Sequence, residues 1–138
     1  MSKVINKVRS LNLPKDKYTV YGGGILDAYG LRESKDIDLV VTPDLFLELE
    51  IAGWERDKSK HYNALKFENI EVTYDWNLQD YDFRRSAKYL LKNSIEIDGI
   101  NFVKPNEVLK YKKALMRPKD IRDIELLEAY IKNSKTPK

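Results

Sequence analysis

The sequence contains no cysteine and only one histidine, His61, among its 138 residues. Without cysteine the chain can form no disulfide scaffold, thiolate zinc site, iron–sulfur cluster or cysteine nucleophile. A single histidine excludes metal centres built from several histidines and disfavours a serine–histidine–aspartate triad. We expect His61 itself to lie at the surface, beside a hairpin.

Long hydrophobic runs are also missing. No stretch approaches the roughly 18 apolar residues of a membrane helix, and the first ten residues, MSKVINKVRS, lack the apolar region of a signal peptide. An apolar content of 42% and an aromatic content of 11% argue against disorder. We therefore expect a cytoplasmic protein with no membrane contact, folded as a single domain over residues 1–138.

The net charge of +3 hides a segregation along the chain. Residues 1–17 carry five basic and one acidic side chain, residues 18–103 carry ten and sixteen, and residues 104–138 carry ten and five. This differs from the uniformly basic footprint of a nucleic-acid binder. It suits a site where carboxylates hold cations and lysines hold phosphates, although charges on solvated faces would give the same pattern.

Helix-like and strand-like segments alternate. Apolar spacing and proline or glycine boundaries predict helices over residues 4–11, 25–29, 43–52, 81–91, 105–116 and 119–131. Residues 18–21, 37–41, 62–67, 70–76, 94–97 and 100–103 read as strands, and Asp98-Gly99 predicts a hairpin between the last two. In the last helix, Ile121, Ile124, Leu127 and Ile131 form the expected buried stripe. The fold class is therefore α/β or α+β, with helices packed on a mixed sheet and two C-terminal helices.

Three features coincide between residues 21 and 41. The triplet Gly22-Gly23-Gly24 separates a strand from a helix, where a backbone can closely approach a phosphate, although an ordinary turn would look the same. Asp36 and Asp38 lie two apart at the start of an apolar strand, so both carboxylates share one face. Two carboxylates this close repel each other unless a proton or a hard cation such as Mg²⁺ lies between them. The alternative is that the pair marks a strand edge that faces solvent. Arg32 and Ser34 precede the pair and could reach an anion bound over the glycines.

In order and spacing these residues resemble the signature of the nucleotidyltransferase superfold. That fold is shared by polymerase-β-like enzymes, lincosamide and aminoglycoside adenylyltransferases, and nucleotidyltransferases of toxin–antitoxin loci. The residues that carry the resemblance are Gly22-Gly23, Asp27-Ala28, Gly30-Leu31-Arg32, Ser34 and Asp36-Ile37-Asp38. Residues 109–124 are similar to a helical pair of the small bacterial members, in which a lysine is followed by arginine, lysine and aspartate.

The resemblance implies a single reaction. An acceptor hydroxyl attacks the α-phosphate of a nucleoside triphosphate, expected to be ATP, and pyrophosphate leaves. Asp36 and Asp38 would hold Mg²⁺ or Mn²⁺ as catalytic carboxylates. The residues implied in nucleotide binding are Gly22, Gly23, Gly24, Arg32, Ser34 and Lys112. Lys113 is the alternative to Lys112, which as a helix lysine could also be simply solvated.

A third carboxylate would complete the catalytic and metal site. Glu71, Thr73 and Asp75 share one face of the strand where the family places this residue. We favour Glu71, in the position that the family usually fills with aspartate, and keep Asp75 as the alternative. Asp120 and Asp123 we expect to be structural, with Asp120 satisfying free N–H groups at a helix start.

The sequence leaves the acceptor unidentified and allows a second function. Because the chain is short for this family, we expect the acceptor to bind at a homodimer interface or to belong to a partner protein. The alternative function is a non-catalytic partner or antitoxin that keeps the fold. A nucleic-acid binder using the basic ends ranks below both, since no reading motif is recognisable.

Overall fold

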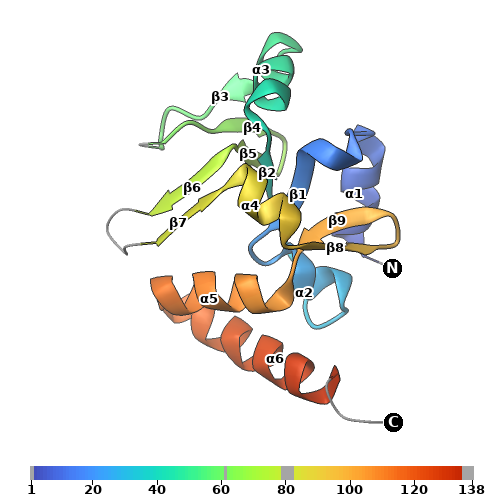
Figure 1. The fold of residues 1–138 in the computed structure, drawn as a ribbon, viewed down its shortest axis with the longest axis vertical. Coiled ribbons are helices and arrows are strands. Elements are labelled where there is room, and N and C mark those ends of the chain that lie inside the picture. Colours follow the sequence, from blue (N-terminus) through green and yellow to red (C-terminus); the bar gives the residue numbers. More distant parts are fainter. Residues whose placement is uncertain (1, 61, 79–82, 135–138) are drawn as a thin grey trace.

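A computed structural model of the chain describes residues 2–60, 62–78 and 83–134, and it shows a mixed α+β architecture (Figure 1). Within these residues there are six α-helices. They are α1 (Lys3–Leu11), α2 (Gly24–Ala28), α3 (Pro43–Ile51), α4 (Ala87–Lys92), α5 (Pro105–Leu115) and α6 (Pro118–Ser134). The strands are β1 (Tyr18–Tyr21), β2 (Ile37–Val41), β3 (Glu55–Arg56), β4 (Leu65–Phe67), β5 (Ile70–Thr73), β6 (Asp75–Leu78), β7 (Phe83–Ser86), β8 (Ser94–Ile97) and β9 (Ile100–Val103).

Seven strands form one mixed sheet in the order β3-β4-β5-β2-β1-β9-β8. The inner pairs β2–β5 and β1–β9 are parallel, whereas β1–β2 and the outer pairs are antiparallel. The remaining strands, β6 and β7, pair with each other in a separate two-stranded sheet. The expected fold class, a mixed sheet with helices packed on it, is confirmed.

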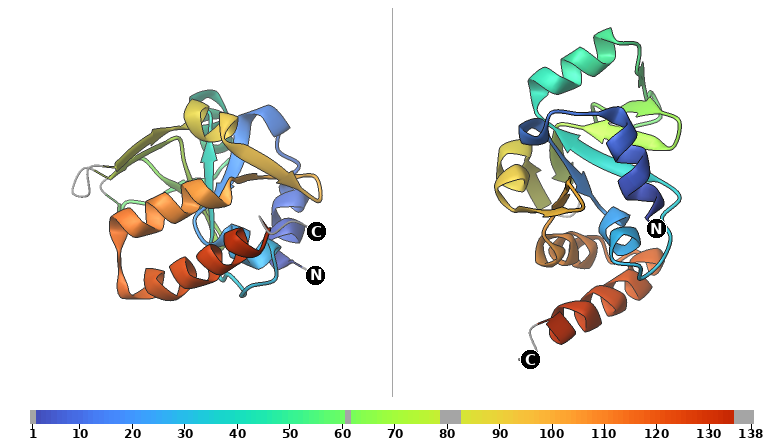
Figure 2. Two further views of the ribbon diagram at one scale, coloured as in Figure 1. Left: turned by 60° about the horizontal axis from the view of Figure 1, so that its bottom comes forward. Right: turned by 90° about the vertical axis from the view of Figure 1, so that its right-hand side faces the viewer.

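The helices cover both faces of the main sheet (Figure 2). In the right-hand view, α1 and α2 lie on one side of the sheet and α4 lies on the other. Helices α5 and α6 pack against each other beyond the end of the sheet. All four residues of β1 are buried, as expected for a strand that has neighbours on both edges and helices on both faces. This arrangement leaves the start of β2 facing the α5–α6 pair.

Local sequence signals explain where several elements begin and turn. Ser2 caps α1 by accepting a hydrogen bond from the backbone N–H of Ile5, and proline opens both α3 and α5. Asp98 and Gly99 both adopt positive φ, which the tight turn between β8 and β9 requires. The hairpin predicted at this dipeptide is therefore present.

The helix predicted over residues 81–91 is wrong in its first half. Residues 83–86 form strand β7, which pairs with β6, and the helix starts only at Ala87. The physical reason is Ser86, whose hydroxyl accepts a hydrogen bond from the backbone N–H of Tyr89. An N-cap residue lies outside its helix, so the residues before it must take another conformation.

Two other boundaries and one buried position also differ from the sequence prediction. The strand predicted over residues 62–67 begins only at Leu65, and the strand predicted over 70–76 divides at Tyr74, so that Asp75 starts the second sheet. Ile121, expected in the buried stripe of α6, is 50% exposed because it lies on the outer side of the first turn. Ile124 and Leu127 are buried as predicted.

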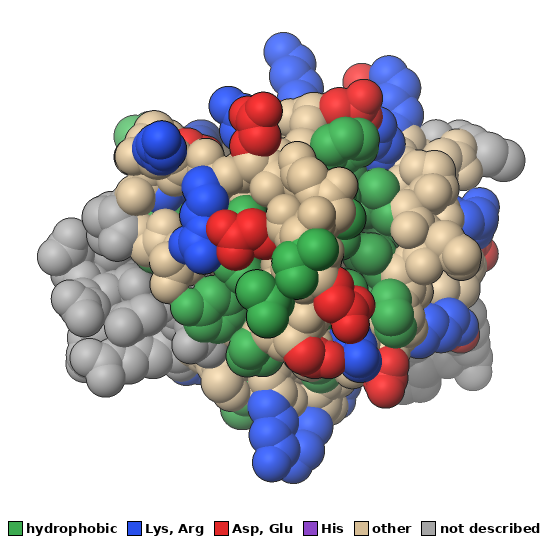
Figure 3. Space-filling model, turned by 90° about the horizontal axis from the view of Figure 1, so that it is seen from above, with side chains coloured by type: hydrophobic (Ala, Val, Ile, Leu, Met, Phe, Trp, Pro, Cys, Tyr) green, Lys and Arg blue, Asp and Glu red, His purple; other side chains and the backbone are tan. Residues whose placement is uncertain are grey.

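The end of the molecule that carries α3 exposes apolar side chains. Leu47 and Ile51 of α3 are 56% and 78% exposed. Figure 3, which looks onto this end, shows hydrophobic side chains gathered in the middle, with basic and acidic side chains around them. Within the described residues, no helix has both the length and the apolar character needed to cross a membrane.

Candidate active site

The backbone that follows β1 lies directly against the acidic residues of β2. Gly22 has a φ of +69°, and a Cβ at this position would lie 2.9 Å from Oδ2 of Asp38. A Cβ on Gly23 would overlap the guanidinium of Arg32. The positive φ of Gly22 therefore favours glycine there, and at both positions the missing side chain lets the backbone approach Asp38 and Arg32 closely. Gly22 and Gly23 border a cavity of about 1000 Å³.

Gly24 has a different environment. It is the first residue of α2 and is buried, and a Cβ there would lie 2.6 Å from Cγ1 of Val20. It does not border the cavity. The need for glycine at this position is therefore explained by packing of α2 against β1.

Three carboxylates border the same cavity from neighbouring strands. Asp38 of β2 lies opposite Glu71 of β5 in a parallel pair, and Asp36 lies one residue before β2. Burial, together with the negative charges of Glu71 and Asp36, raises the pKa of Asp38 to about 6, against the weaker opposing effect of Lys112 and Lys119. The negative charges of Glu71 and Asp36 therefore lie close enough to Asp38 to disfavour its ionised form.

Glu71 has partners of its own. Its Oε1 accepts a hydrogen bond of 2.8 Å from the hydroxyl of Tyr62, and its Oε2 lies 3.8 Å from Nζ of Lys60. Asp75, the alternative third carboxylate, begins β6 and pairs with Ser86 in the second sheet. The side chain of Asp75 lies outside the described part of the structure.

The donor chemistry of this acidic group fits a hard divalent cation, because carboxylate oxygens are the ligands that Mg²⁺ and Mn²⁺ prefer. Among the described residues, however, no three acidic or histidine side chains already converge as a metal-binding group. The bonds from Tyr62 and Lys60 direct the Glu71 carboxylate to other partners. A cation at Asp36, Asp38 and Glu71 would therefore require this side chain to turn.

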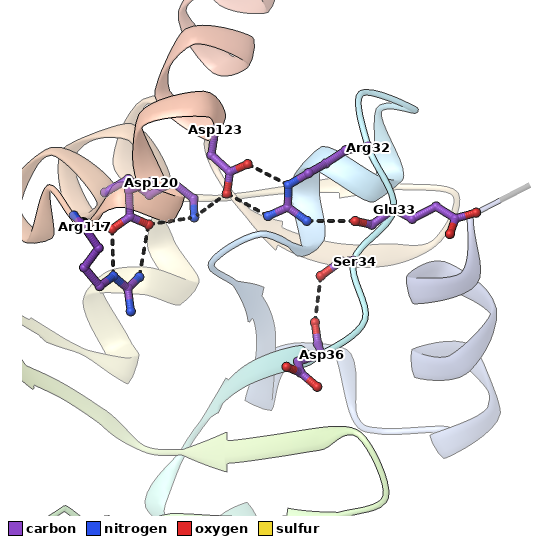
Figure 4. Close-up of polar contacts among 8 residues, drawn as sticks. Arg32, Glu33, Ser34, Asp36, Arg117, Asp120 and Asp123 are labelled. Atoms are coloured by element: carbon purple, nitrogen blue, oxygen red, sulfur yellow. Dashed lines mark hydrogen bonds and ion pairs between the residues drawn. The ribbon is translucent and has the colours of Figure 1, made fainter.

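Arg32 and Lys112, both expected to contact phosphate, share one buried aspartate, Asp123. Figure 4 shows Asp123 beside Arg32. Asp123 of α6 accepts bonds of 2.6 and 2.7 Å from Nε and Nη2 of Arg32 and lies 3.0 Å from Nζ of Lys112. Lys112 is only 4% exposed and also lies 3.5 Å from Asp120. Both cations border the cavity, but their charge is already balanced by aspartates.

Asp120 and Asp123 act as structural residues, as expected from the sequence. Asp120 is fully buried, and its Oδ2 accepts hydrogen bonds from the backbone N–H and from Nε of Arg117, the residue before α6. Burial opposes ionisation of both carboxyls, but hydrogen bonds from Arg117 to Asp120, and from Arg32 and Lys112 to Asp123, hold each pKa below its usual value. The two aspartates thus join α6 to α5 and to the loop that carries Arg32.

Ser34 supports the same loop. Its hydroxyl donates a 2.7 Å hydrogen bond to the backbone carbonyl of Asp36, and its backbone N–H donates to Oδ2 of Asp27 (Figure 4 shows the first contact). Asp27 is buried and also accepts a bond from the hydroxyl of Ser2. The aspartate and serine of the sequence motif therefore hold the loop between α2 and β2 in place.

Sequence reasoning missed several residues that border the cavity. Tyr62 contacts Glu71. Lys66 of β4 and Lys119 in the first turn of α6 also border the cavity, and their ammonium groups have no bonded partner in the part of the chain that the structure describes. Lys66 carried a usable signal, since it lies opposite Glu71 in the β4–β5 hairpin that the sequence predicts. Lys119 belongs to the arginine, lysine and aspartate of the second sequence motif, but its position at the cavity depends on the packing of α6. His61 lies outside the described residues.

No family model matches the sequence, and no curated protein matches it. Among solved structures, the chain is similar to the crystal structure of ANT(2'')-Ia in complex with adenylyl-2''-tobramycin, with a TM-score of 0.57 and 19% sequence identity. The likeness covers 94% of this chain and 86% of that chain. At this identity it shows a common fold, and that fold is the nucleotidyltransferase fold expected from the sequence.

Proposed function

We propose that this protein is a nucleotidyltransferase that uses Mg²⁺ or Mn²⁺ to move a nucleoside monophosphate from a nucleoside triphosphate to an acceptor hydroxyl. ATP is the expected donor. The observation that carries the proposal is the pairing of Asp38 with Glu71 on adjacent parallel strands, with Asp36 beside them and the Gly22 backbone against Asp38.

The likeness to ANT(2'')-Ia supports the same reaction class. That structure contains adenylyl-2''-tobramycin, in which an adenylyl group is joined to an aminoglycoside. A compound of this kind is what nucleotidyl transfer to an acceptor produces. For this chain we leave the acceptor's chemistry open, and a second copy of the chain or a partner protein is a proposed source of further acceptor contacts.

In the proposed site, Asp36, Asp38 and Glu71 hold the divalent cation. When bound, the cation neutralises phosphate charge and polarises the reacting oxygens. The chain's own contribution is to position the reactants. The backbone of Gly22 and Gly23 allows close approach, and the loop tied by Ser34 and Asp27 keeps Asp36 at the cavity.

A thermal-shift panel tests the proposal. The four nucleoside triphosphates are added to wild type, Asp36→Asn and Asp38→Asn, each with and without Mg²⁺. A ligand at a hundred times its dissociation constant stabilises a protein by about 2.7 kcal/mol, which is a shift of several degrees for a chain of this size. We expect a shift with at least one triphosphate that needs Mg²⁺ and is absent from both variants. Unchanged shifts in the variants would move the site away from the aspartate pair.

A non-catalytic binding partner or antitoxin with this fold is the second candidate. One observation favours it: Arg32 and Lys112 both form ion pairs with Asp123. The positive charges of these two residues are therefore neutralised in the absence of a ligand. This candidate predicts no shift with any triphosphate. A pull-down with the intact wild-type chain would then follow, and recovery of a specific protein partner would support it.

A further inference from the structure

The cavity beside the acidic residues contains cations that are not committed to structural ion pairs. Among the described residues, the ammonium groups of Lys35, Lys66 and Lys119 border the cavity and form no hydrogen bond or ion pair. Lys35 lies in the loop before β2, whereas Lys66 and Lys119 are positioned by β4 and α6. Arg32 and Lys112, by contrast, share Asp123. A ligand phosphate that approached Arg32 or Lys112 would have to compete with a buried aspartate, whereas Lys66 and Lys119 can pair with an added anion at no such cost.

Lys66 lies on one side of the acidic row. In the antiparallel β4–β5 pair its partner is Glu71, which is also the partner of Asp38 across the parallel β5–β2 pair. Directly opposite residues in a sheet project on the same face, with Cβ atoms about 5 Å apart. The Lys66 side chain therefore extends beside the carboxylates that are proposed to hold the cation.

Lys119 borders the cavity from a different element, the first turn of α6. Asp38 borders the same cavity, and the ammonium of Lys119 contacts no carboxylate among the described residues. A lysine in the first turn of a helix is unfavourable, because the helix dipole is positive there. A bound anion would remove this cost, and the cavity between α6 and the sheet is where it would bind.

We propose that Lys66 and Lys119, which border the cavity from β4 and α6, bind the β- and γ-phosphates of the donor nucleotide, while Arg32 and Lys112 keep a structural role. This inference rests on the proposed function and names the residues that recognise the triphosphate. A cation held by Asp36, Asp38 and Glu71 neutralises only part of the negative charge of the triphosphate, and the two lysines neutralise more of it. They therefore favour a nucleoside triphosphate over a monophosphate.

The test uses the intact chain, Mg²⁺ and the α,β-methylene analogue of the triphosphate that gives the largest shift in the panel above. This analogue cannot transfer its nucleotidyl group, so binding is measured alone. We expect Lys66→Ala and Lys119→Ala each to raise its dissociation constant about tenfold, the effect of one lost charge-assisted hydrogen bond. Lys113→Ala is the matched control. Lys113 is the alternative to Lys112 in the sequence prediction, but in the structure it pairs with Glu128 and is not among the residues that border the cavity.

A second probe, inorganic tripolyphosphate with Mg²⁺, has neither base nor sugar. It should stabilise wild type and Lys113→Ala against heat, and should stabilise the two cavity variants less. Neither cavity variant should lose melting temperature without ligand, since neither lysine has an ion pair to lose. Affinities equal to the Lys113→Ala control, with binding still lost in Asp38→Asn, would overturn the lysine assignment and leave the proposed function standing. If wild type bound no nucleotide, both the lysine assignment and the proposed function would be overturned.

Discussion

Asp38 lies between charges of both signs, and its neighbours come from three different parts of the chain. Glu71 and Asp36 disfavour its ionised form, whereas Lys112 and Lys119 favour it. The first two neighbours are on the strand pair, and the last two belong to the C-terminal helices. The protonation of this carboxyl therefore depends on how the helices are placed over the sheet, and a cation bound beside it would outweigh the repulsion from Glu71 and Asp36.

Substitution can separate the two candidates for the third carboxylate. We expect Glu71→Gln to reduce nucleotidyl transfer more than Asp75→Asn, because Glu71 lies opposite Asp38 in the sheet whereas Asp75 belongs to the second sheet. The readout is transfer from an α-labelled nucleoside triphosphate, with melting temperature recorded for each variant. Glu55→Gln is the matched control, since Glu55 lies on the exposed edge strand β3, outside the cavity. The opposite ranking would assign the role to Asp75.

For the site residues, the sequence predicted which ones lie together at the cavity, but it did not predict which side chains they bond to. Asp36, Asp38, Glu71, Gly22 and Gly23 all border the cavity because strand periodicity and a glycine turn are local properties. The pairing of Arg32 with Asp123 spans 91 positions and depends on how α6 docks. Such a contact has no local signal, so Arg32 was expected to face a ligand when it faces a helix.

Helix α6 is held to the rest of the molecule by charge as well as by apolar packing. Asp123 binds Arg32 and Lys112, and Asp120 binds Arg117, all within or at the edge of the core. Removing one partner of a buried ion pair leaves the others uncompensated, which costs about 3–5 kcal/mol. We therefore expect Asp123→Ala to lower the free energy of unfolding by that amount and to speed amide exchange in α6, as measured by urea unfolding and hydrogen exchange.

Glu128→Ala is the control for this prediction, because Glu128 is on the same helix and pairs with Lys113 in an exposed bridge worth at most about 1 kcal/mol. Asp123→Asn keeps the side-chain volume and provides a second variant if the alanine variant does not fold. Equal effects of Asp123→Ala and Glu128→Ala would show that the buried ion pairs contribute no more than the exposed one.

Acid should weaken the same contacts. The pKa values of folded Asp120 and Asp123 lie below the ordinary value, so their ion pairs stabilise the fold above a pH of about 4. This stabilisation is lost as the pH falls through the folded pKa values. The difference in urea midpoint between wild type and Asp123→Asn should accordingly be large at pH 7 and small near pH 2.

Element prediction succeeded where a local signal and the tertiary structure agree. The Asp98-Gly99 hairpin, the proline starts of α3 and α5, and the buried strands β1 and β2 all follow from such signals. The segment before α4 failed because Phe83, Ala87, Leu90 and Leu91 have helical spacing although the first of them is in a strand. Pairing with β6 decides the conformation there, and helical spacing contains no information about that pairing.

The apolar core joins the first helix to the last. A continuous cluster of buried side chains runs from Val4 in α1 to Leu127 in α6 and includes residues of both parallel strand pairs. A core shared in this way should unfold as one unit. We expect thermal unfolding monitored by far-UV and near-UV circular dichroism to give coincident transitions, as a single domain requires. A separate early transition that removed only helical signal would mean that α5 and α6 unfold independently.

The position of β1 has a consequence for the synthesis of this protein in the cell. β1 lies between β2, which follows it closely in sequence, and β9, whose Phe102 pairs with Val20. On the ribosome, the edge of β1 that receives β9 stays unpaired for several seconds, at about 5–20 residues per second, until the last third of the chain emerges. During that time the nascent chain presents a strand that the folded protein buries completely, and the strand has a free edge. Chaperones bind segments of this kind, which aggregate when they stay unprotected.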